Sequence, residues 1–194
     1  DKEVTIASIA DILAKGSGLG SSSAFTIGLV NVLANPDQHS SLVSREYLAQ
    51  TAYMIERQMC GYPVGKQDQY AAAYGGFNLF EFEKNGNVTT RTLNMSDGFI
   101  HNLESNLMLV YSGKGRQANS ILQKQQKAMD DKEKFNSVRK MRDRAYTAMK
   151  YLEDGDFDSF GDMLHSSWLD KKSVVNEISE DYLDIVYKKA TDAG

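Results

Sequence analysis

The chain has almost no cysteine, no long apolar run and no excess of positive charge. Cys60 is the single cysteine among 194 residues, which excludes an internal disulfide and fits a reducing cytoplasm. No apolar run approaches the roughly 20 residues that a membrane-spanning helix needs, and no signal peptide follows the opening Asp1-Lys2-Glu3. The formal net charge of −4 gives no general attraction to nucleic acid or to anionic membranes. We therefore expect a cytoplasmic protein with no nucleic-acid or membrane partner.

The composition is that of an ordinary globular protein. Hydrophobic residues make up 41% and charged residues 25% of the chain. A length of 194 residues suffices for one large domain or two small ones. The first half mixes strand and helix patterns and the second half is helical, with a boundary near residues 100–106. We expect an α+β protein with domains over residues 1–104 and 105–194.

Apolar periodicity and turn residues predict the individual elements. The first half is expected to hold a strand over 3–13, a helix of about 15 residues ending near Asn35, a helix from Ser44 to Met59, a short helix over 67–74, hairpin strands over 77–83 and 88–93, and a strand over 107–111. The second half is expected to hold helices around 135–152, 157–168 and 182–190.

The segment from Lys15 to Phe25 carries the clearest functional signal. Three alternate glycines (Gly16, Gly18, Gly20) run into three serines and then into an apolar segment. Glycine lets the backbone turn tightly and approach a ligand, and a helix that begins among the serines offers N–H groups and a positive dipole end. The combination predicts an anion site for the phosphates of a nucleotide. Apolar residues on both sides argue against a flexible linker.

Two better-known phosphate loops do not fit this segment. A P-loop needs a Lys-Ser/Thr pair after its last glycine, and the dinucleotide fingerprint needs a glycine where Ser21 stands. Zinc is not expected either, since the three histidines share no ligand spacing, and the serines lack the elbow of a serine hydrolase.

Two carboxylates and a serine are the chemical candidates. Ser22 is expected to help ligate a hard cation such as Mg²⁺. Glu56 lies late in the second helix, where the alternative is a solvated carboxylate beside Arg57. Asp68 is either a helix first-turn residue or a carboxylate near the phosphate loop that orients or deprotonates an attacking hydroxyl. Lys66, two residues earlier, is expected to keep Asp68 ionised. Arg116, after a strand end, either grips a substrate anion or is solvated.

Several of these segments resemble the GHMP kinases, the family of galactokinase, homoserine kinase and mevalonate kinase. Residues 16–24 (Gly-Ser-Gly-Leu-Gly-Ser-Ser-Ser-Ala) are similar to the family's second conserved motif. Glu56-Arg57 followed by residues 65–76 is similar to the branch that acts on D-glycero-D-manno-heptose phosphates, as are residues 106–113 and 165–168. The resemblance covers nearly the whole chain.

The resemblance implies ATP-dependent phosphoryl transfer to a sugar hydroxyl, in this branch the anomeric hydroxyl of heptose 7-phosphate. ATP, Mg²⁺ and a small sugar phosphate are then the implied ligands, and the oligomeric state stays open, a homo-oligomer included. Asp68 matches the catalytic aspartate, with Lys66 beside it, and Glu56 and Ser22 match the magnesium ligands. The implied triphosphate loop consists of Gly16, Ser17, Gly18, Leu19, Gly20, Ser21, Ser22 and Ser23. The implied substrate side consists of Asp68, Tyr74, Gly75, Gly76 and Arg116.

The implied fold is a two-domain α+β kinase, with an N-terminal part like ribosomal protein S5 and a helical, ferredoxin-like C-terminal part. The family's first motif (a Pro-x-Arg strand with a Gly-rich loop) and its third, Gly-rich motif are absent. We therefore expect the central part of a longer kinase, incomplete at both ends and with little activity alone. The alternatives are a fucose or galactose type of GHMP kinase, a nonenzymatic sugar or nucleotide sensor, and a scaffold built from the C-terminal helices.

Overall fold

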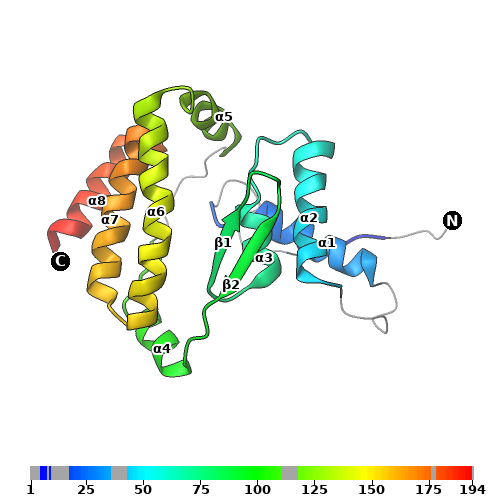
Figure 1. Ribbon diagram of the computed structural model, residues 1–194, viewed down its shortest axis with the longest axis horizontal. Helices are drawn as coiled ribbons and strands as arrows, with labels where there is room; N and C mark the ends of the chain where they lie inside the picture. Colours follow the sequence, from blue (N-terminus) through cyan, green and yellow to red (C-terminus); the bar gives the residue numbers. More distant parts are fainter. Residues whose placement is uncertain are drawn as a thin grey trace.

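The computed structural model describes residues 5–7, 9, 18–35, 43–110, 118–175 and 178–193, and most of these residues are helical (Figure 1). The elements are α1 (Ser21–Ala34), α2 (Arg45–Met54), the π-helix η1 (Ile55–Met59), α3 (Gln67–Tyr74), β1 (Asn78–Phe82), β2 (Val88–Thr92), α4 (Asp97–Ser105), α5 (Ala118–Ala128), α6 (Lys132–Asp154), α7 (Phe157–Val174) and α8 (Asp181–Ala193). Within these ranges no helix is both long and apolar enough to cross a bilayer.

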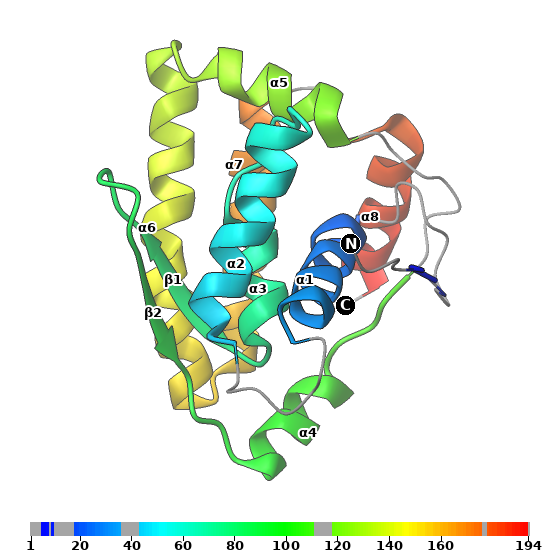
Figure 2. The same ribbon diagram turned by 90° about the vertical axis from the view of Figure 1, so that its right-hand side faces the viewer.

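Helices α1, α2 and α3 pack together and enclose a small apolar core, and they lie side by side in Figure 2. The core consists of Ile27 and Val30 of α1 with Leu48 and Ala52 of α2. Helix α2 begins at Ser44, whose hydroxyl accepts from Tyr47 N at 3.1 Å, a standard N-cap. The predicted positions of all three helices are confirmed.

The predicted second helix contains a change of helix type. It is α-helical to Met54 and then forms η1, in which Cys60 N donates to Ile55 O at 2.9 Å. This five-residue spacing inserts an extra residue into the turn, a feature that occurs frequently at functional sites. The spacing of apolar residues predicted one continuous α-helix, because that spacing does not reveal a single turn whose hydrogen bonds span five residues.

The predicted hairpin is confirmed and forms a two-stranded antiparallel sheet. Asn78 lies opposite Thr92 and Phe82 lies opposite Val88. The hairpin stands between α3 on one side and α6 on the other (Figure 1). On the α3 side, the Phe80 ring lies 5.8 Å from that of Tyr70 and 5.6 Å from that of Tyr74. On the α6 side, Tyr146 Oη donates to Glu81 Oε1 at 2.6 Å, and Arg91 pairs with Glu153 at 2.6 Å.

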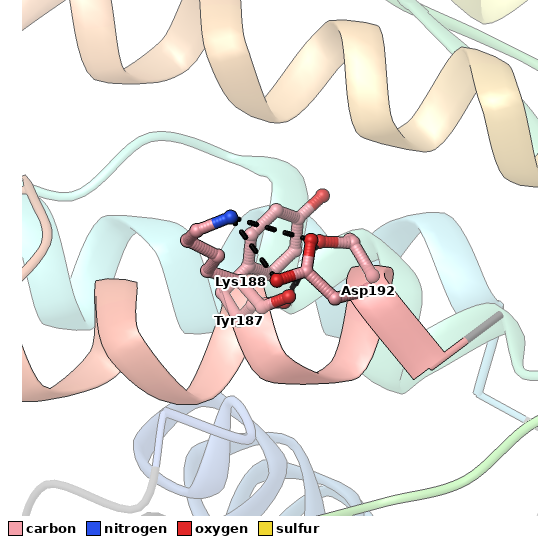
Figure 3. A network of polar contacts seen from close by, with 4 residues as sticks. Tyr187, Lys188 and Asp192 are labelled. Atoms are coloured by element: carbon pink, nitrogen blue, oxygen red, sulfur yellow. Dashed lines mark hydrogen bonds and ion pairs between the residues drawn. The ribbon is translucent and has the colours of Figure 1, made fainter.

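The long helices α6 and α7 run antiparallel and are joined at Gly155, which has a φ of 72°. Arg144 of α6 forms a partly buried ion pair with Asp170 of α7. Helix α8 is attached through Tyr187, whose hydroxyl lies 2.7 Å from His165 Nδ1, and Figure 3 shows the adjoining ion pair of Lys188 with Asp192 at 3.0 Å. Helices α6, α7 and α8 were predicted, whereas α4 and α5 were not, and the mixed α+β class is confirmed.

Two predicted strands are wrong at the residues that the structure describes. Residues 5–7 and 9 lie outside any helix or strand, and so do residues 107–110; the other positions of the first strand, and Tyr111, lie outside the described ranges. Ile9 is 95% exposed and Met108 is 87% exposed. A strand needs a neighbour for its backbone hydrogen bonds, and β1 and β2 in this part of the chain pair only with each other. A strand-like pattern alone therefore did not produce a strand.

Candidate functional site

The Gly/Ser segment forms a tight turn into α1. Gly18 and Gly20 have φ values of 73° and 69°, in the left-handed region that glycine adopts without strain. Gly20 is the N-cap of α1, no side chain caps this end, and its first turn contains no acidic residue. A helix start without a side-chain cap carries N–H groups and a positive partial charge suited to an anion. Gly16 and Ser17, the first two residues of the predicted loop, lie outside the described residues.

A buried carboxylate lies directly behind this turn. Glu56 of η1 is 2% exposed. Ser22 Oγ donates to Glu56 Oε1 at 2.5 Å, and Ser23 Oγ donates to Glu56 Oε2 at 2.8 Å. Gln69 Nε2 of α3 also donates to Oε2. Two elements that are distant in sequence, α1 and α3, therefore converge on the carboxylate of η1.

The alternative reading of Glu56 as a solvated carboxylate beside Arg57 does not describe the structure. The Glu56 side chain points into the protein, and Arg57 Nη1 donates instead to Tyr62 O at 3.2 Å. The sequence contains a signal for this burial. Glu56 follows Leu48 by eight residues and Ala52 by four, so that it lies on the same helix face as these two core residues.

The oxygen atoms around Glu56 fit a magnesium ion. The three described partners of the carboxylate are neutral donors, and none of the ion pairs found in the described ranges involves it. A buried carboxylate without a positive partner is unfavourable, which favours a cation nearby. Mg²⁺ prefers hard oxygen ligands, and Ser22 Oγ and Glu56 Oε1 are two such atoms in direct contact, so these residues could hold the ion.

The protein alone does not provide a complete metal centre in the described residues. No group of three His, Cys, Asp or Glu side chains gathers there. Mg²⁺ commonly binds one or two protein carboxylates and completes its six ligands with waters and substrate phosphates. Ser22 and Glu56, which lie beside a helix start suited to an anion, fit this pattern of coordination.

Asp68 lies beside the same turn. It is exposed and belongs to the first turn of α3. A Cβ atom built on Gly20 would lie 3.9 Å from both Cβ and Cγ of Asp68. The absence of a side chain at Gly20 therefore leaves open space between the helix start and the carboxylate. An acceptor hydroxyl beside Asp68 would also be beside an anion held at α1.

Lys66 does not form the expected contact with Asp68. Its ammonium donates to Gly86 O in the hairpin turn and lies 5.4 Å from the centre of the Tyr53 ring. Two residues apart at a helix start, the two side chains diverge, because only residues three or four apart share a helix face. Lys66 instead ties the hairpin turn to the start of α3.

The predicted substrate residues are not gathered at this site. Asp68 is in the first turn of α3, whereas Tyr74 ends the helix and Gly75 and Gly76 follow it, about 9 Å further along the axis. Tyr74 Oη donates to Glu46 Oε2 at 3.2 Å, within the aromatic cluster on the hairpin. Arg116 lies outside the described residues.

Gln69 is the residue that the sequence reasoning missed. Its side chain is completely buried, and its amide donates to Glu56 while its Oε1 has no partner within the described residues. Its position in the segment Gln67-Asp68-Gln69 was visible, but helix periodicity does not say which of two glutamines faces inward.

The aromatic support behind the site includes a second fixed carboxylate. Tyr70 is completely buried, and its hydroxyl donates to Glu46 Oε1 at 2.6 Å. Burial and the neighbouring Glu46 carboxylate raise the pKa of Tyr70 well above its ordinary value. The phenol therefore remains a neutral hydrogen-bond donor that joins α3 to α2.

Comparisons with known proteins identify similar families and chains. Residues 3–76 match the family described as GHMP kinases N terminal domain. The chain is 33% identical over 180 residues to D-glycero-alpha-D-manno-heptose 7-phosphate kinase of Campylobacter jejuni, an alignment that covers 92% of this chain and 52% of that protein. It is 24% identical over 181 residues to the bifunctional fucokinase/GDP-fucose pyrophosphorylase of Arabidopsis thaliana, covering 90% of this chain and 17% of that protein.

A solved structure shares the fold. The crystal structure of a D-glycero-D-manno-heptose 1-phosphate kinase from Bacteroides thetaiotaomicron superposes with a TM-score of 0.63 at 30% identity, over 81% of this chain and 44% of that one. The chain thus spans at most about half the length of these relatives.

Proposed function

We propose that this chain, which belongs to the GHMP kinase family, forms the nucleotide- and metal-binding part of an ATP-dependent sugar kinase. One observation carries the proposal. The uncapped start of α1, the Ser22–Glu56 pair and the Asp68 carboxylate lie around the same turn. An anion site, a pair of hard oxygens and an exposed carboxylate are the parts that phosphoryl transfer requires.

Each part has a distinct task in this proposal. The segment from Gly16 to Ser23 holds the triphosphate through backbone N–H groups at the start of α1. Ser22 and Glu56 hold Mg²⁺, which, when bound, offsets negative charge on the phosphates. Asp68 orients the sugar hydroxyl and accepts its proton as the oxygen attacks the terminal phosphorus, while the bond from that phosphorus to the bridging oxygen of ATP breaks and ADP leaves. We assign residues 1–104 to this nucleotide-binding part and residues 105–194 to a second domain.

For the substrate we propose a heptose 7-phosphate, phosphorylated at its anomeric hydroxyl. The name of the Campylobacter relative, at 33% identity, supports this choice. Fucose is the second candidate, supported by the Arabidopsis relative at 24% identity. In this proposal Asp68 contacts the reacting hydroxyl, whereas Arg116 and the segment from Tyr74 to Gly76, which begins about 9 Å further along α3, contact more distant parts of the sugar phosphate.

The test is a phosphorylation assay on the expressed protein that contains these 194 residues. ATP and Mg²⁺ are supplied with heptose 7-phosphate, fucose or galactose, and product is followed by mass spectrometry. Asp68→Asn should lower kcat about 10²- to 10⁴-fold, the usual contribution of a general base, while nucleotide affinity changes less than about twofold. Asp158→Asn is the matched control, because Asp158 is also an exposed aspartate in a helix first turn.

The outcomes separate the alternatives. A nonenzymatic sensor predicts binding of sugar or nucleotide with no phosphorylated product and no effect of Asp68→Asn. A scaffold predicts no nucleotide binding at all. Either result contradicts the proposal. Preference for fucose over heptose 7-phosphate would retain the kinase and correct the substrate.

A further inference from the structure

The hydrogen bonds of Glu56 are distributed unequally over its two oxygens. Oε2 accepts from Ser23 Oγ and from Gln69 Nε2, and both donor side chains are buried. Oε1 accepts from Ser22 Oγ, whose residue is exposed at the start of α1. One oxygen is therefore held by the protein interior and the other faces the turn.

The Gln69 amide can be placed in only one way. A carboxylate accepts hydrogen bonds and does not donate them, so Nε2 must face Glu56. This leaves Gln69 Oε1 buried without a partner in the described ranges. An unpaired buried acceptor is unfavourable, and the contact with Glu56 is what compensates for it. Gln69 is therefore committed to this carboxylate.

Gln69 also follows Asp68 directly in the first turn of α3. Successive residues of an α-helix point about 100° apart. This rotation directs Asp68 toward Gly20 and the exposed turn, and Gln69 toward Glu56 in the interior. A single turn of backbone thus fixes both carboxylates of the site relative to each other.

We infer that Gln69 is a positioning residue for the cation: it retains Glu56 Oε2 so that Oε1 stays directed at Ser22 and available to the metal. The inference rests on the proposed function, in which Ser22 and Glu56 hold Mg²⁺. Without the amide, Ser23 Oγ is the one described donor left on Oε2, so the carboxylate is held less firmly and the direction of Oε1 is less well fixed. Residues behind a metal ligand commonly change metal affinity 10- to 100-fold when altered.

The test uses Gln69→Met, which removes the donor while keeping side-chain length and neutrality. Gln67→Met is the matched control, because Gln67 belongs to the same helix and is exposed. Mn²⁺ binding in the presence of a nonhydrolysable ATP analogue is measured by electron paramagnetic resonance. Gln69→Met should weaken Mn²⁺ binding about 10-fold or more, and Gln67→Met should change it less than about twofold.

A kinetic measurement separates positioning from a merely structural effect. In the phosphorylation assay, Gln69→Met should raise the KM for Mg²⁺. The observed rate should then return to that of the unmodified protein at saturating Mg²⁺ concentration. A loss of folded enzyme would lower the rate at every Mg²⁺ concentration and leave that KM unchanged. Unchanged Mn²⁺ affinity in folded Gln69→Met would overturn the inference.

Two further measurements keep the outcomes distinguishable. Glu56→Gln tests the metal site itself: if it leaves Mn²⁺ binding intact, the proposed metal site fails; if it weakens binding while Gln69→Met does not, only the role of Gln69 fails. Should Gln69→Met not fold, the side-chain amide of Gln69 is followed by NMR in the unmodified protein. Its signal should shift on addition of Mg²⁺ with the ATP analogue, and an unshifted signal would contradict the inference.

Discussion

Ser22 and Glu56 are 34 positions apart in sequence, yet Ser22 Oγ donates to Glu56 Oε1 at 2.5 Å. The contact joins the start of α1 to the π-helix η1 at the surface end of the buried carboxylate. While the serine donates its hydrogen to Glu56, its lone pairs face away. A cation that binds both oxygens must displace that hydrogen toward another acceptor. The structure shows the pair closed by a hydrogen bond, and the proposed function requires a second arrangement in which both oxygens face the metal.

The two serines next to each other in α1 should have separable roles. Ser23 is 4% exposed and donates to the interior oxygen of Glu56, whereas Ser22 is exposed. Ser23→Ala should lower the free energy of unfolding by about 1.5–3 kcal/mol, the range for a hydrogen bond to a charged group. Ser22→Ala should lower it by less than about 1 kcal/mol and should weaken Mn²⁺ binding more than Ser23→Ala does. Urea unfolding and metal titration check the pair, and equal effects of both changes on both quantities would contradict this division.

Gly20, the N-cap of α1, and Gly28, within α1, should respond in opposite directions to alanine. Gly20 has a φ of 69°, which an alanine adopts at a cost of about 1–2 kcal/mol, and the added methyl would occupy the space facing Asp68. Gly28 lies within α1 with open space around its Cα, so alanine should stabilise the helix by about 0.5–1 kcal/mol.

Thermal unfolding measures both variants, and Gly28→Ala serves as the control for Gly20→Ala. In addition, Gly20→Ala should weaken binding of the ATP analogue, whereas Gly28→Ala should not. Stabilisation by Gly20→Ala would show that the left-handed turn is not formed in solution.

Much of the fold follows from local sequence signals. Ser44 begins α2, and Gly155 separates α6 from α7, because an N-cap hydroxyl and a left-handed glycine each act on the chain within a few residues. The strand patterns over 3–13 and 107–111 were less reliable. A strand depends on a neighbouring strand, which can lie anywhere in the sequence, and at the described residues of both segments there is none.

The site shows the same division between local and distant information. The glycine turn could be predicted from the sequence, because positive φ angles and a helix start are local properties. The burial of Glu56 depends on packing between α1, η1 and α3, although its spacing from Leu48 and Ala52 indicated the face. The direction in which the Lys66 side chain points could not be predicted from the sequence, because its partner is the Gly86 carbonyl in the distant hairpin turn.

The ion pairs of α6 should differ in their contribution to stability. Arg144 and Asp170 join α6 to α7 with side chains 28% and 19% exposed, whereas Arg142 and Asp143 of α6 are 62% and 60% exposed. Asp170→Asn should lower the free energy of unfolding by about 1–3 kcal/mol, because a charged hydrogen bond is lost in a partly dry interface. Asp143→Asn, the matched control, should cost less than about 1 kcal/mol. Urea unfolding measures both, and comparable losses would show that exposure does not decide the difference.

The hydrogen bond from Tyr70 to Glu46 should make stability depend on alkaline pH. Burial raises the pKa of Tyr70 above its ordinary value of 10.0, with Glu46 adding to the effect. Below pH 10 the phenol is protonated in both folded and unfolded chains, so the stabilisation is fully present. Above it the unfolded chain loses the proton first, and the free energy of unfolding falls as pH rises.

Tyr70→Phe tests this dependence directly. At pH 8 the change should lower the free energy of unfolding by about 1.5–3 kcal/mol, because the charged hydrogen bond to Glu46 is lost. The difference between Tyr70→Phe and the unmodified protein should shrink as pH rises from 9 to 11, since phenylalanine has no proton to lose. Tyr47→Phe is the matched control, with a side chain on α2 that is 52% exposed. Urea unfolding at several pH values measures the differences, and a Tyr70→Phe gap that stays constant up to pH 11 would contradict the assignment.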